Sequence, residues 1–201
     1  MTILATDAFD GTDADLGTAW DVMTSEDAWL RLSGVAQPTN LLNDATESNN
    51  SVTWPDDQYS VAPATVDATT AGAGPGVAVR CATGSRTYYR VVINGDGEWE
   101  LAKLVTGTFT SLASGTTTYS AGAIIRLESQ STTLRAYYNG SQLGTDVTDS
   151  AIATGRAGVS YSSPAVSASL ASWEGGDLGT GASGVVGTRS TGRGFERGVW
   201  R

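Results

Sequence analysis

Short runs of β-branched and aromatic residues, separated by turns, recur along the whole 201-residue chain. Thr, Ser, Val and Gly fill the sequence, and few long windows lack a glycine, a proline or clustered β-branched residues, so helices are disfavoured. Strands at such close spacing are typical of β-sandwiches and barrels. The pattern predicts strands over residues 28–32, 59–66, 76–81, 87–94, 98–105, 124–129, 134–138, 158–161 and 168–173.

Two Asn-Gly steps mark tight turns between predicted strands. One lies in Asn94-Gly95-Asp96-Gly97 and the other is Asn139-Gly140. Asn-Gly supplies the positive φ angles of a type I′ hairpin, and such a turn fixes the register of the strands on both sides. Hairpins of this kind predict an all-β fold, an antiparallel two-sheet β-sandwich.

The charge of the chain excludes several classes of function. The net charge is −9, and residues 1–57 alone carry eleven acids and one base, Arg31. An acidic surface repels phosphates, so we expect no nucleic-acid partner and no anionic membrane partner. The sequence contains no histidine. Histidine-based triads, histidine-ligated zinc and an imidazole general base are therefore excluded.

Cysteine usage and the N-terminus add further limits. Cys81 is the single cysteine, so an intramolecular disulfide is excluded, and its place in an alternating run predicts a small residue on a strand. A reactive thiol is the alternative, but no base lies nearby in the sequence. No apolar run reaches about eighteen residues, the length that would cross a membrane. The first residues lack a basic region followed by an apolar stretch, so we expect no secretory signal and synthesis in the cytoplasm.

Residues 176–201 differ in composition from the rest of the chain. They contain eight glycines, and four arginines against two acids. Such a segment is flexible by itself, because glycine loses much backbone entropy on ordering and few apolar groups compensate. Aromatic residues spaced among its arginines favour a docking arm over a solvated C-terminus. The residues expected to dock are Arg189, Arg193, Phe195, Arg197, Val199 and Trp200.

The part of the chain before this arm resembles the concanavalin A-like lectin/glucanase superfamily, in the LamG-like modules found in phage structural proteins. The stretches that carry the resemblance are DAFD at 7–10 followed by Trp20, GVAVR at 76–80, YYRVVIN at 88–94, AGAIIRLE at 121–128, LRAYYNG at 134–140 and TDSAIATGRAGV at 148–159. The resemblance implies a jelly-roll sandwich over residues 1–175, whose relatives bind glycans, cleave them or build virions. The arm at 176–201 departs from this module.

Glu98 and Glu100 are the first candidates for chemistry. Glycosidases use two carboxyl groups about 5–10 Å apart, and alternate residues of a strand project from one face about 7 Å apart. The related glucanases carry Glu-x-Asp-x-x-Glu, and this run is missing here. The position after an Asn-Gly turn also predicts a solvated polar strand face. We therefore expect no enzymatic activity.

The acidic loop at residues 10–17 is a candidate calcium site. Asp10, Asp13 and Asp15 alternate or nearly alternate with small residues, and Ca²⁺ takes six to eight oxygen ligands. The loop lacks the twelve-residue spacing and the closing glutamate of an EF-hand. Aspartates also cap turns by accepting hydrogen bonds from backbone amides, which is the alternative.

Aromatic residues give the candidate glycan site. Trp54 lies in a polar loop and can stack on a sugar ring, with Asp56 and Asp57 bonding hydroxyls and Tyr59 sharing the surface. A buried loop anchor is the alternative role for Trp54. By contrast, Trp29 and Trp173 lie in strand patterns and are predicted to belong to the core.

Together these features predict a non-enzymatic virion structural protein of a phage or phage-like particle. It would be a capsid decoration, tail or fibre component, with its arm docked on other virion proteins or on copies of itself. The identification as phage rests on the resemblance. The alternative is a glycan-binding module for host-surface attachment, which requires a sugar site. No cofactor is expected apart from the calcium ion considered above.

Overall fold

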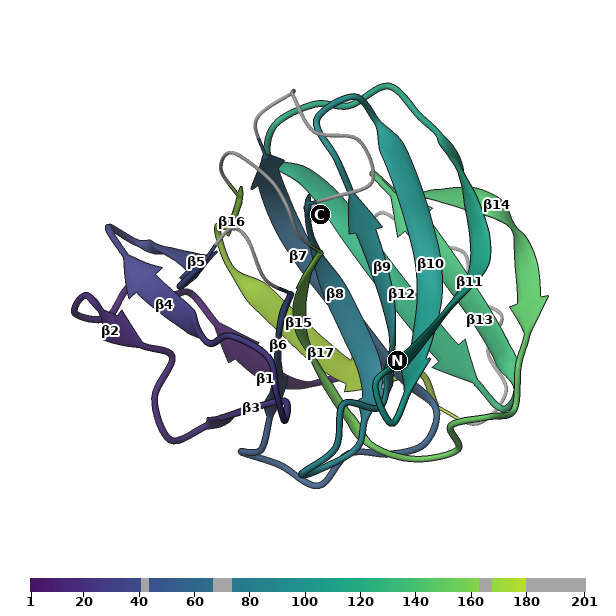
Figure 1. Cartoon of the computed structure of the whole chain (residues 1–201), viewed down its shortest axis with the longest axis horizontal. Helices are drawn as coiled ribbons and strands as arrows, with labels where there is room; N and C mark the ends of the chain where they lie inside the picture. Colours follow the sequence, from purple (N-terminus) through teal and green to yellow (C-terminus); the bar gives the residue numbers. More distant parts are fainter. Residues whose placement is uncertain (41–43, 67–73, 163–167, 180–201) are drawn as a thin grey trace, which may run out of the picture.

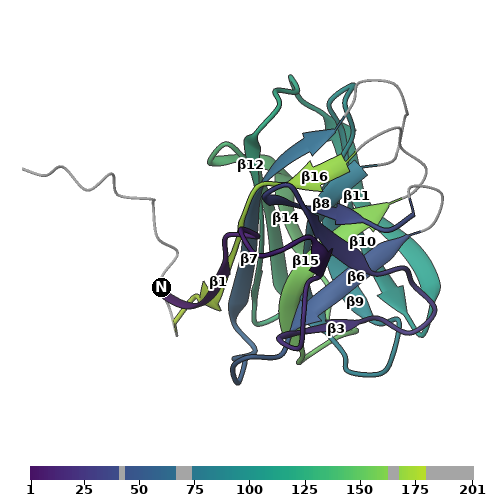
Figure 2. The same ribbon diagram turned by 90° about the vertical axis from the view of Figure 1, so that its left-hand side faces the viewer.

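The computed structural model describes residues 1–40, 44–66, 74–162 and 168–179. Strands dominate these residues, and they assemble into two antiparallel sheets packed face to face (Figure 1). A view along the layers separates β1 and β7 on one side from β6, β9 and β10 on the other (Figure 2). The all-β sandwich predicted from the sequence is therefore confirmed. No helix of the described residues has the length and apolar character needed to cross a bilayer.

The larger sheet has ten strands. Its main path runs β14-β13-β12-β7-β16-β5-β4-β2, and β17 joins β1 to β7 beside this path. Its strands are β1 (Thr2–Asp7), β2 (Ala14–Asp15), β4 (Trp29–Leu32), β5 (Val35–Pro38), β7 (Gln58–Val66), β12 (Ala123–Gln130), β13 (Thr133–Tyr138), β14 (Ser141–Thr148), β16 (Ala168–Leu170) and β17 (Trp173–Asp177). The short strands β2, β4 and β5 form one end of the molecule, at the left of Figure 1.

The smaller sheet has seven strands in the order β11-β10-β9-β8-β15-β6-β3. They are β3 (Trp20–Val22), β6 (Ala45–Asn49), β8 (Gly74–Cys81), β9 (Tyr88–Ile93), β10 (Glu98–Val105), β11 (Thr108–Thr116) and β15 (Arg156–Ser162). Strand β11 ends the path and pairs only with β10 among the described strands. The order places the β9–β10 and β10–β11 hairpins at one side of this sheet.

The space between the sheets is filled by aromatic and aliphatic side chains. Trp20 and Trp173 meet edge to face with ring centroids 4.8 Å apart, and Trp54 also meets Trp173 edge to face, at 5.9 Å. Trp29 and Trp173 are fully buried, as predicted. Burial of these large rings supplies much of the apolar stabilisation that holds the two sheets together.

The two predicted Asn-Gly turns have different outcomes. Asn139 and Gly140 have φ angles of +49° and +80°, the two positive values of a type I′ turn. The expectation for Asn94-Gly95 is wrong, because the positive φ lies at Gly97 (+84°). The loop there has three residues, closed by Asn94 N–H donating to the carbonyl oxygen of Glu98 at 2.9 Å. A three-residue loop ending in a left-handed glycine is the next commonest hairpin solution.

The single strand predicted over 168–173 is two strands, β16 and β17. Both strands pair with β7. Leu170 of β16 lies opposite Ala64, and Glu174 of β17 lies opposite Val61, so the pairing register with β7 shifts by one residue between the two strands. Pro63 lies in this gap, and proline has no N–H to donate to a neighbouring strand. The proline therefore explains why the ladder is interrupted here.

The predicted boundary between residues 175 and 176 is also wrong. Gly176 pairs with Ile3 on one side and with Tyr59 on the other, inside strand β17. A Cβ atom at Gly176 would lie 2.2 Å from the carbonyl oxygen of Thr2. The glycines at the start of the predicted arm thus allow close packing and do not make it flexible. Leu178 is buried as well, so the sandwich extends at least to the last described residue, Gly179.

Candidate functional site

One half of the outer face of the seven-stranded sheet is covered by the chain that follows β3. Met23 packs against Ala78, Cys81, Tyr88 and Leu104 in a small buried cluster on this face. The Cys81 side chain is fully buried, and burial raises the pKa of its thiol. The interpretation of Cys81 as a small strand residue therefore agrees with its surroundings, and a thiol of raised pKa is a poor nucleophile.

A polar cluster holds this covering segment to the sheet. The Glu26 carboxylate accepts hydrogen bonds from the Tyr88 hydroxyl and from Nε of Arg86, the latter at 2.5 Å. Arg86 also donates to Asp44 at 2.6 Å, and Asp44 lies 3.6 Å from Nη1 of Arg90. Burial raises the pKa of Tyr88, so its hydroxyl remains a proton donor. These bonds make this half of the face part of the folded structure rather than an open site.

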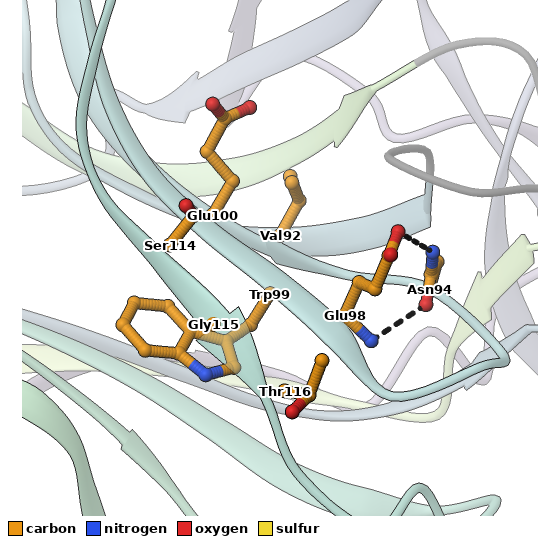
Figure 3. Close-up of a pocket in the computed structure, with 8 residues that line it drawn as sticks. All are labelled: Val92, Asn94, Glu98, Trp99, Glu100, Ser114, Gly115 and Thr116. Carbon is orange, nitrogen blue, oxygen red and sulfur yellow. Dashed lines mark hydrogen bonds between the residues drawn. The ribbon is translucent and has the colours of Figure 1, made fainter.

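The other half of the same face contains an open cavity of about 330 Å³. We call this cavity the groove (Figure 3). It lies over strands β9, β10 and β11. Its lining residues are Val92, Asn94, Glu98, Trp99, Glu100, Ser114, Gly115 and Thr116.

Two carboxylates lie on the groove side of β10. Strand alternation puts Glu98 and Glu100 on one face, as the sequence predicted, and Ser114 and Thr116 lie directly opposite them on β11. Asn94 fixes Glu98 through two bonds: its Nδ2 donates to Oε2 at 3.1 Å, and its Oδ1 accepts from the Glu98 amide at 2.8 Å. Figure 3 shows the Glu100 side chain extending away from this pair.

Trp99 supports the groove from the other side of β10. Its ring carbons lie 3.0 Å from the positions that Cβ atoms would take at Gly115 of β11 and Gly144 of β14. The indole therefore packs directly on the backbone of these two strands, which only glycine allows at this distance. The side chain is almost fully buried. Its rigid packing fixes the backbone that carries Glu98 and Glu100.

Phe109 provides an exposed aromatic ring on the same face. Phe109 belongs to β11 and pairs with Leu104 of β10. Leu104 and Glu100 are four residues apart on β10, so their side chains lie on one face of the sheet, and Phe109 lies on that face too. The side chain is 47 % exposed, one of the few large apolar residues that the described surface presents. The guanidinium carbon of Arg90 lies 5.8 Å from the centre of the ring and supports it from the sheet side.

Sequence reasoning missed Phe109 and the other β11 residues. The strand was not predicted, since its sequence TFTSLASGT lacks a strict apolar alternation. Two sequence features could have indicated this strand. The dipeptide Thr106-Gly107 can form the turn of a hairpin, and an uncharged run rich in Thr and Ser follows it.

Trp54 lies at a different place from the groove. It borders a second cavity, of about 460 Å³, together with Thr53, Thr83, Thr154 and Arg156. The indole N–H donates to the carbonyl oxygen of Asn49 at 2.7 Å, and the ring packs against the core. These contacts agree with the alternative role of a loop anchor, while part of the ring still faces the cavity.

The three residues predicted to share the Trp54 site do not line this cavity. Tyr59 is only 1 % exposed, and the guanidinium of Arg126 covers its ring at 3.9 Å. A ring buried in this way has no free face for a sugar, so this part of the prediction is wrong. Asp57 accepts a hydrogen bond from the Ser131 amide at 2.6 Å, and Asp56 is exposed on the surface.

The predicted calcium loop does not assemble a metal site. No group of three acidic or thiol side chains within the described residues could hold a metal ion. Asp13 instead accepts a hydrogen bond from the Ser33 amide at 2.9 Å, which is the turn-capping role named as the alternative. Asp10 and Asp15 are exposed at the surface. The calcium expectation for Asp10, Asp13 and Asp15 is therefore corrected.

The predicted docking residues lie outside the described part of the chain. They are Arg189, Arg193, Phe195, Arg197, Val199 and Trp200, within residues 180–201. Their role remains a prediction from the sequence.

Comparison with solved structures identifies the fold. Carbohydrate-binding module CBM66 from Bacillus subtilis superposes with a TM-score of 0.63 at 13 % sequence identity, over 76 % of this chain and 91 % of that one. The metal-free exoplasmic/lumenal domain of VIP36 gives a TM-score of 0.60 at 12 % identity, over 90 % and 95 % of the two chains. The sequence matches no family profile and no curated protein.

A third neighbour is part of a larger protein. The GH43 protein BlXynB from Bacillus licheniformis, in a mutant form, gives a TM-score of 0.60 at 13 % identity, over 85 % of this chain but 38 % of that one. The matched part of each of the three neighbours is a concanavalin A-like β-sandwich, and the chain described here has this fold. Identity this low establishes architecture only, because one fold supports many functions.

Proposed function

We propose that this protein is a saccharide-binding module and that it binds through the groove over β9, β10 and β11. The observation that carries the proposal is the groove itself. An exposed ring, Phe109, lies on the same sheet face as two carboxylates that line the groove, the exposed Glu98 and the half-buried Glu100. Saccharide sites combine an aromatic platform with a few fixed polar groups in this way.

Phe109, which lies on the same sheet face outside the groove lining, and the groove residues each have a role that follows from their chemistry. The Phe109 ring offers an apolar face for the C–H groups of a pyranose. The carboxylates of Glu98 and Glu100 accept hydrogen bonds from sugar hydroxyls, and Ser114 and Thr116 can donate or accept. Asn94 holds Glu98 in place, so that less side-chain entropy is lost when a ligand binds.

The structural neighbours support this proposal at the level of fold. One is named a carbohydrate-binding module, and VIP36 has also been solved in a form bound to Ca²⁺ and Man3GlcNAc, with a TM-score of 0.62. The groove described here has no such calcium group, since no described cluster could hold a metal ion. We infer that binding would rely on side chains alone.

We further propose that the groove binds saccharides without cleaving them. Glu98 is tied to Asn94, and Glu100 points away from it (Figure 3). A glycosidase needs two carboxyl groups that converge on one glycosidic bond. A divergent pair is better suited to accepting hydrogen bonds from hydroxyls.

A glycan array followed by calorimetric titration tests the proposal. We expect at least one oligosaccharide to bind with a Kd of millimolar or below, and Phe109→Ala to weaken that binding about tenfold, the effect of losing a contact worth ~1.4 kcal/mol. Ile124→Ala is the matched control, because Ile124 is equally exposed at 47 % but lies on the other sheet.

The outcomes of this titration are distinct. The ligand should be recovered intact, with no reducing ends released. Absence of binding across the array contradicts the proposed function, and equal losses for Phe109→Ala and Ile124→Ala contradict the proposed site. Release of reducing ends that Glu98→Gln abolishes would show that the protein is an enzyme.

The virion role predicted from the sequence is compatible with saccharide binding but depends on other residues. It was based on a resemblance and on an arm whose residues 180–201 lie outside the described part of the chain. We keep it as a proposal for where such a module would work. Loss of particle incorporation after removal of residues 180–201 would support it.

A further inference from the structure

The described part of the chain has its side-chain cations already engaged. Eight arginines and lysines occur there, and seven of them form salt bridges with aspartate or glutamate. The eighth, Arg80, is buried and donates to the carbonyl oxygens of Asp56, Ser131 and Ile152. No described arginine or lysine side chain therefore remains free to approach a ligand as a counter-ion for an acid.

The groove carboxylates are left without a positive partner. Within the described residues, no salt bridge reaches Glu98 or Glu100, and the bonds of Glu98 are to the neutral amide of Asn94. Arg90 is the nearest cation along β9, but it is 3 % exposed and directs its guanidinium to Ser162 and Asp44. Lys103 of β10 is paired with Asp149 at 2.5 Å.

We propose that the groove selects saccharides that carry a protonated primary amine. This inference rests on the proposed function and names its ligand class. The ammonium group supplies the positive charge that the protein itself does not provide beside Glu98 and Glu100. A charge-assisted hydrogen bond from nitrogen to a carboxylate is about twice as strong as a neutral one.

The same geometry discriminates against two other classes of sugar. An N-acetylated sugar has no positive charge, so it makes only neutral hydrogen bonds to the carboxylates. A uronic acid brings a second negative charge into a groove lined by two carboxylates and no described cation. Like charges at close range are repelled, and the repulsion weakens with added salt.

The test compares oligosaccharides that differ only at the amine. A β-1,4-linked glucosamine tetramer and its fully N-acetylated form are titrated at about pH 6, where an amine of this type is protonated. We expect the amine form to bind about tenfold tighter, which corresponds to one charge-assisted bond. Glu100→Gln should remove most of this preference, so that the amine and acetylated tetramers then bind with nearly equal affinity.

A matched control separates the groove from the general acidity of the protein. Asp10→Asn removes the same charge from an exposed position near the short strand β2, which belongs to the other sheet. It should leave the preference intact, and any non-specific attraction would fall equally in both variants.

Three results overturn the inference. They are equal or tighter binding of the acetylated tetramer, no binding of either tetramer, and a preference that Glu100→Gln and Asp10→Asn reduce alike. The first leaves the proposed function standing, because a saccharide still binds. Failure of the proposed function is recognised separately, by the absence of any ligand on the full glycan array.

Discussion

Gly76→Ala should destabilise the protein by more than about 3 kcal/mol, an effect large enough to prevent folding of a domain of ordinary stability. A Cβ at Gly76 would lie 1.9 Å from the carbonyl oxygen of Val91 and 2.8 Å from the Cα of Val92. Both atoms are backbone of the neighbouring strand β9, which carries the floor of the groove. Relief of the clash requires the two strands to separate and lose hydrogen bonds.

Gly140→Ala is the control for this variant. Gly140 has a φ of +80°, and nothing lies within 4 Å of the Cβ that alanine would add. It therefore costs only the strain of a left-handed residue, about 1 kcal/mol. Chemical denaturation of both variants measures the difference. Equal stability losses would show that β8 and β9 do not approach as closely as described.

Glu47→Gln should stabilise the protein above neutral pH by up to ~3 kcal/mol. Glu47 is buried on β6, and burial raises the pKa of its carboxyl group from 4.5 to about 7, although the Trp29 amide donates to it at 2.6 Å. The folded state thus keeps a proton on Glu47 that the unfolded state releases near pH 4.5. The stability contributed by this group is fully present at low pH and is lost as the pH rises through about 7.

The difference between wild type and Glu47→Gln isolates this effect from the other titrating groups. The glutamine is neutral at every pH, and its side-chain oxygen can still accept from the Trp29 amide. Unfolding free energies should coincide below about pH 4.5 and diverge between there and pH 7. A constant difference across this range would show that Glu47 does not titrate in the folded protein.

Alternation and turn chemistry predicted the central strands of the fold. Residues 98–105 match β10 at both ends, and the Asn139-Gly140 hairpin has the predicted φ angles. These elements are predictable because one face is apolar and a local turn fixes their register. The shared face of Glu98 and Glu100 followed from the same period.

Strands that depend on tertiary packing escaped prediction. Strand β6, with the sequence ATESN, reads as polar, yet all five of its residues are buried between two neighbouring strands. Strand β11 is exposed along most of its length, so burial imposes no apolar alternation on it. Phe109 and the groove could not be derived from sequence, because they depend on the pairing of β11 with β10.

The glycines near the C-terminus show a second limit of sequence reasoning. The glycine content of residues 176–201 predicts a flexible arm from residue 176 onward, but Gly176 lies beside Gly175 in β17, between β1 and β7. A Cβ at Gly175 would lie 2.6 Å from the Trp54 ring. Composition cannot distinguish a glycine needed for close packing from one in a flexible chain.

Saccharide binding in the groove is the central claim, and amide chemical-shift mapping by NMR tests it most directly. A bound oligosaccharide from the array is titrated into the labelled protein, and the perturbed amides are located on the structure. Saccharide binding at Phe109 predicts shifts over residues 92–100 and 109–116. Shifts gathered instead around Trp54, Thr83 and Arg156 would place the ligand in the second cavity and contradict the assignment.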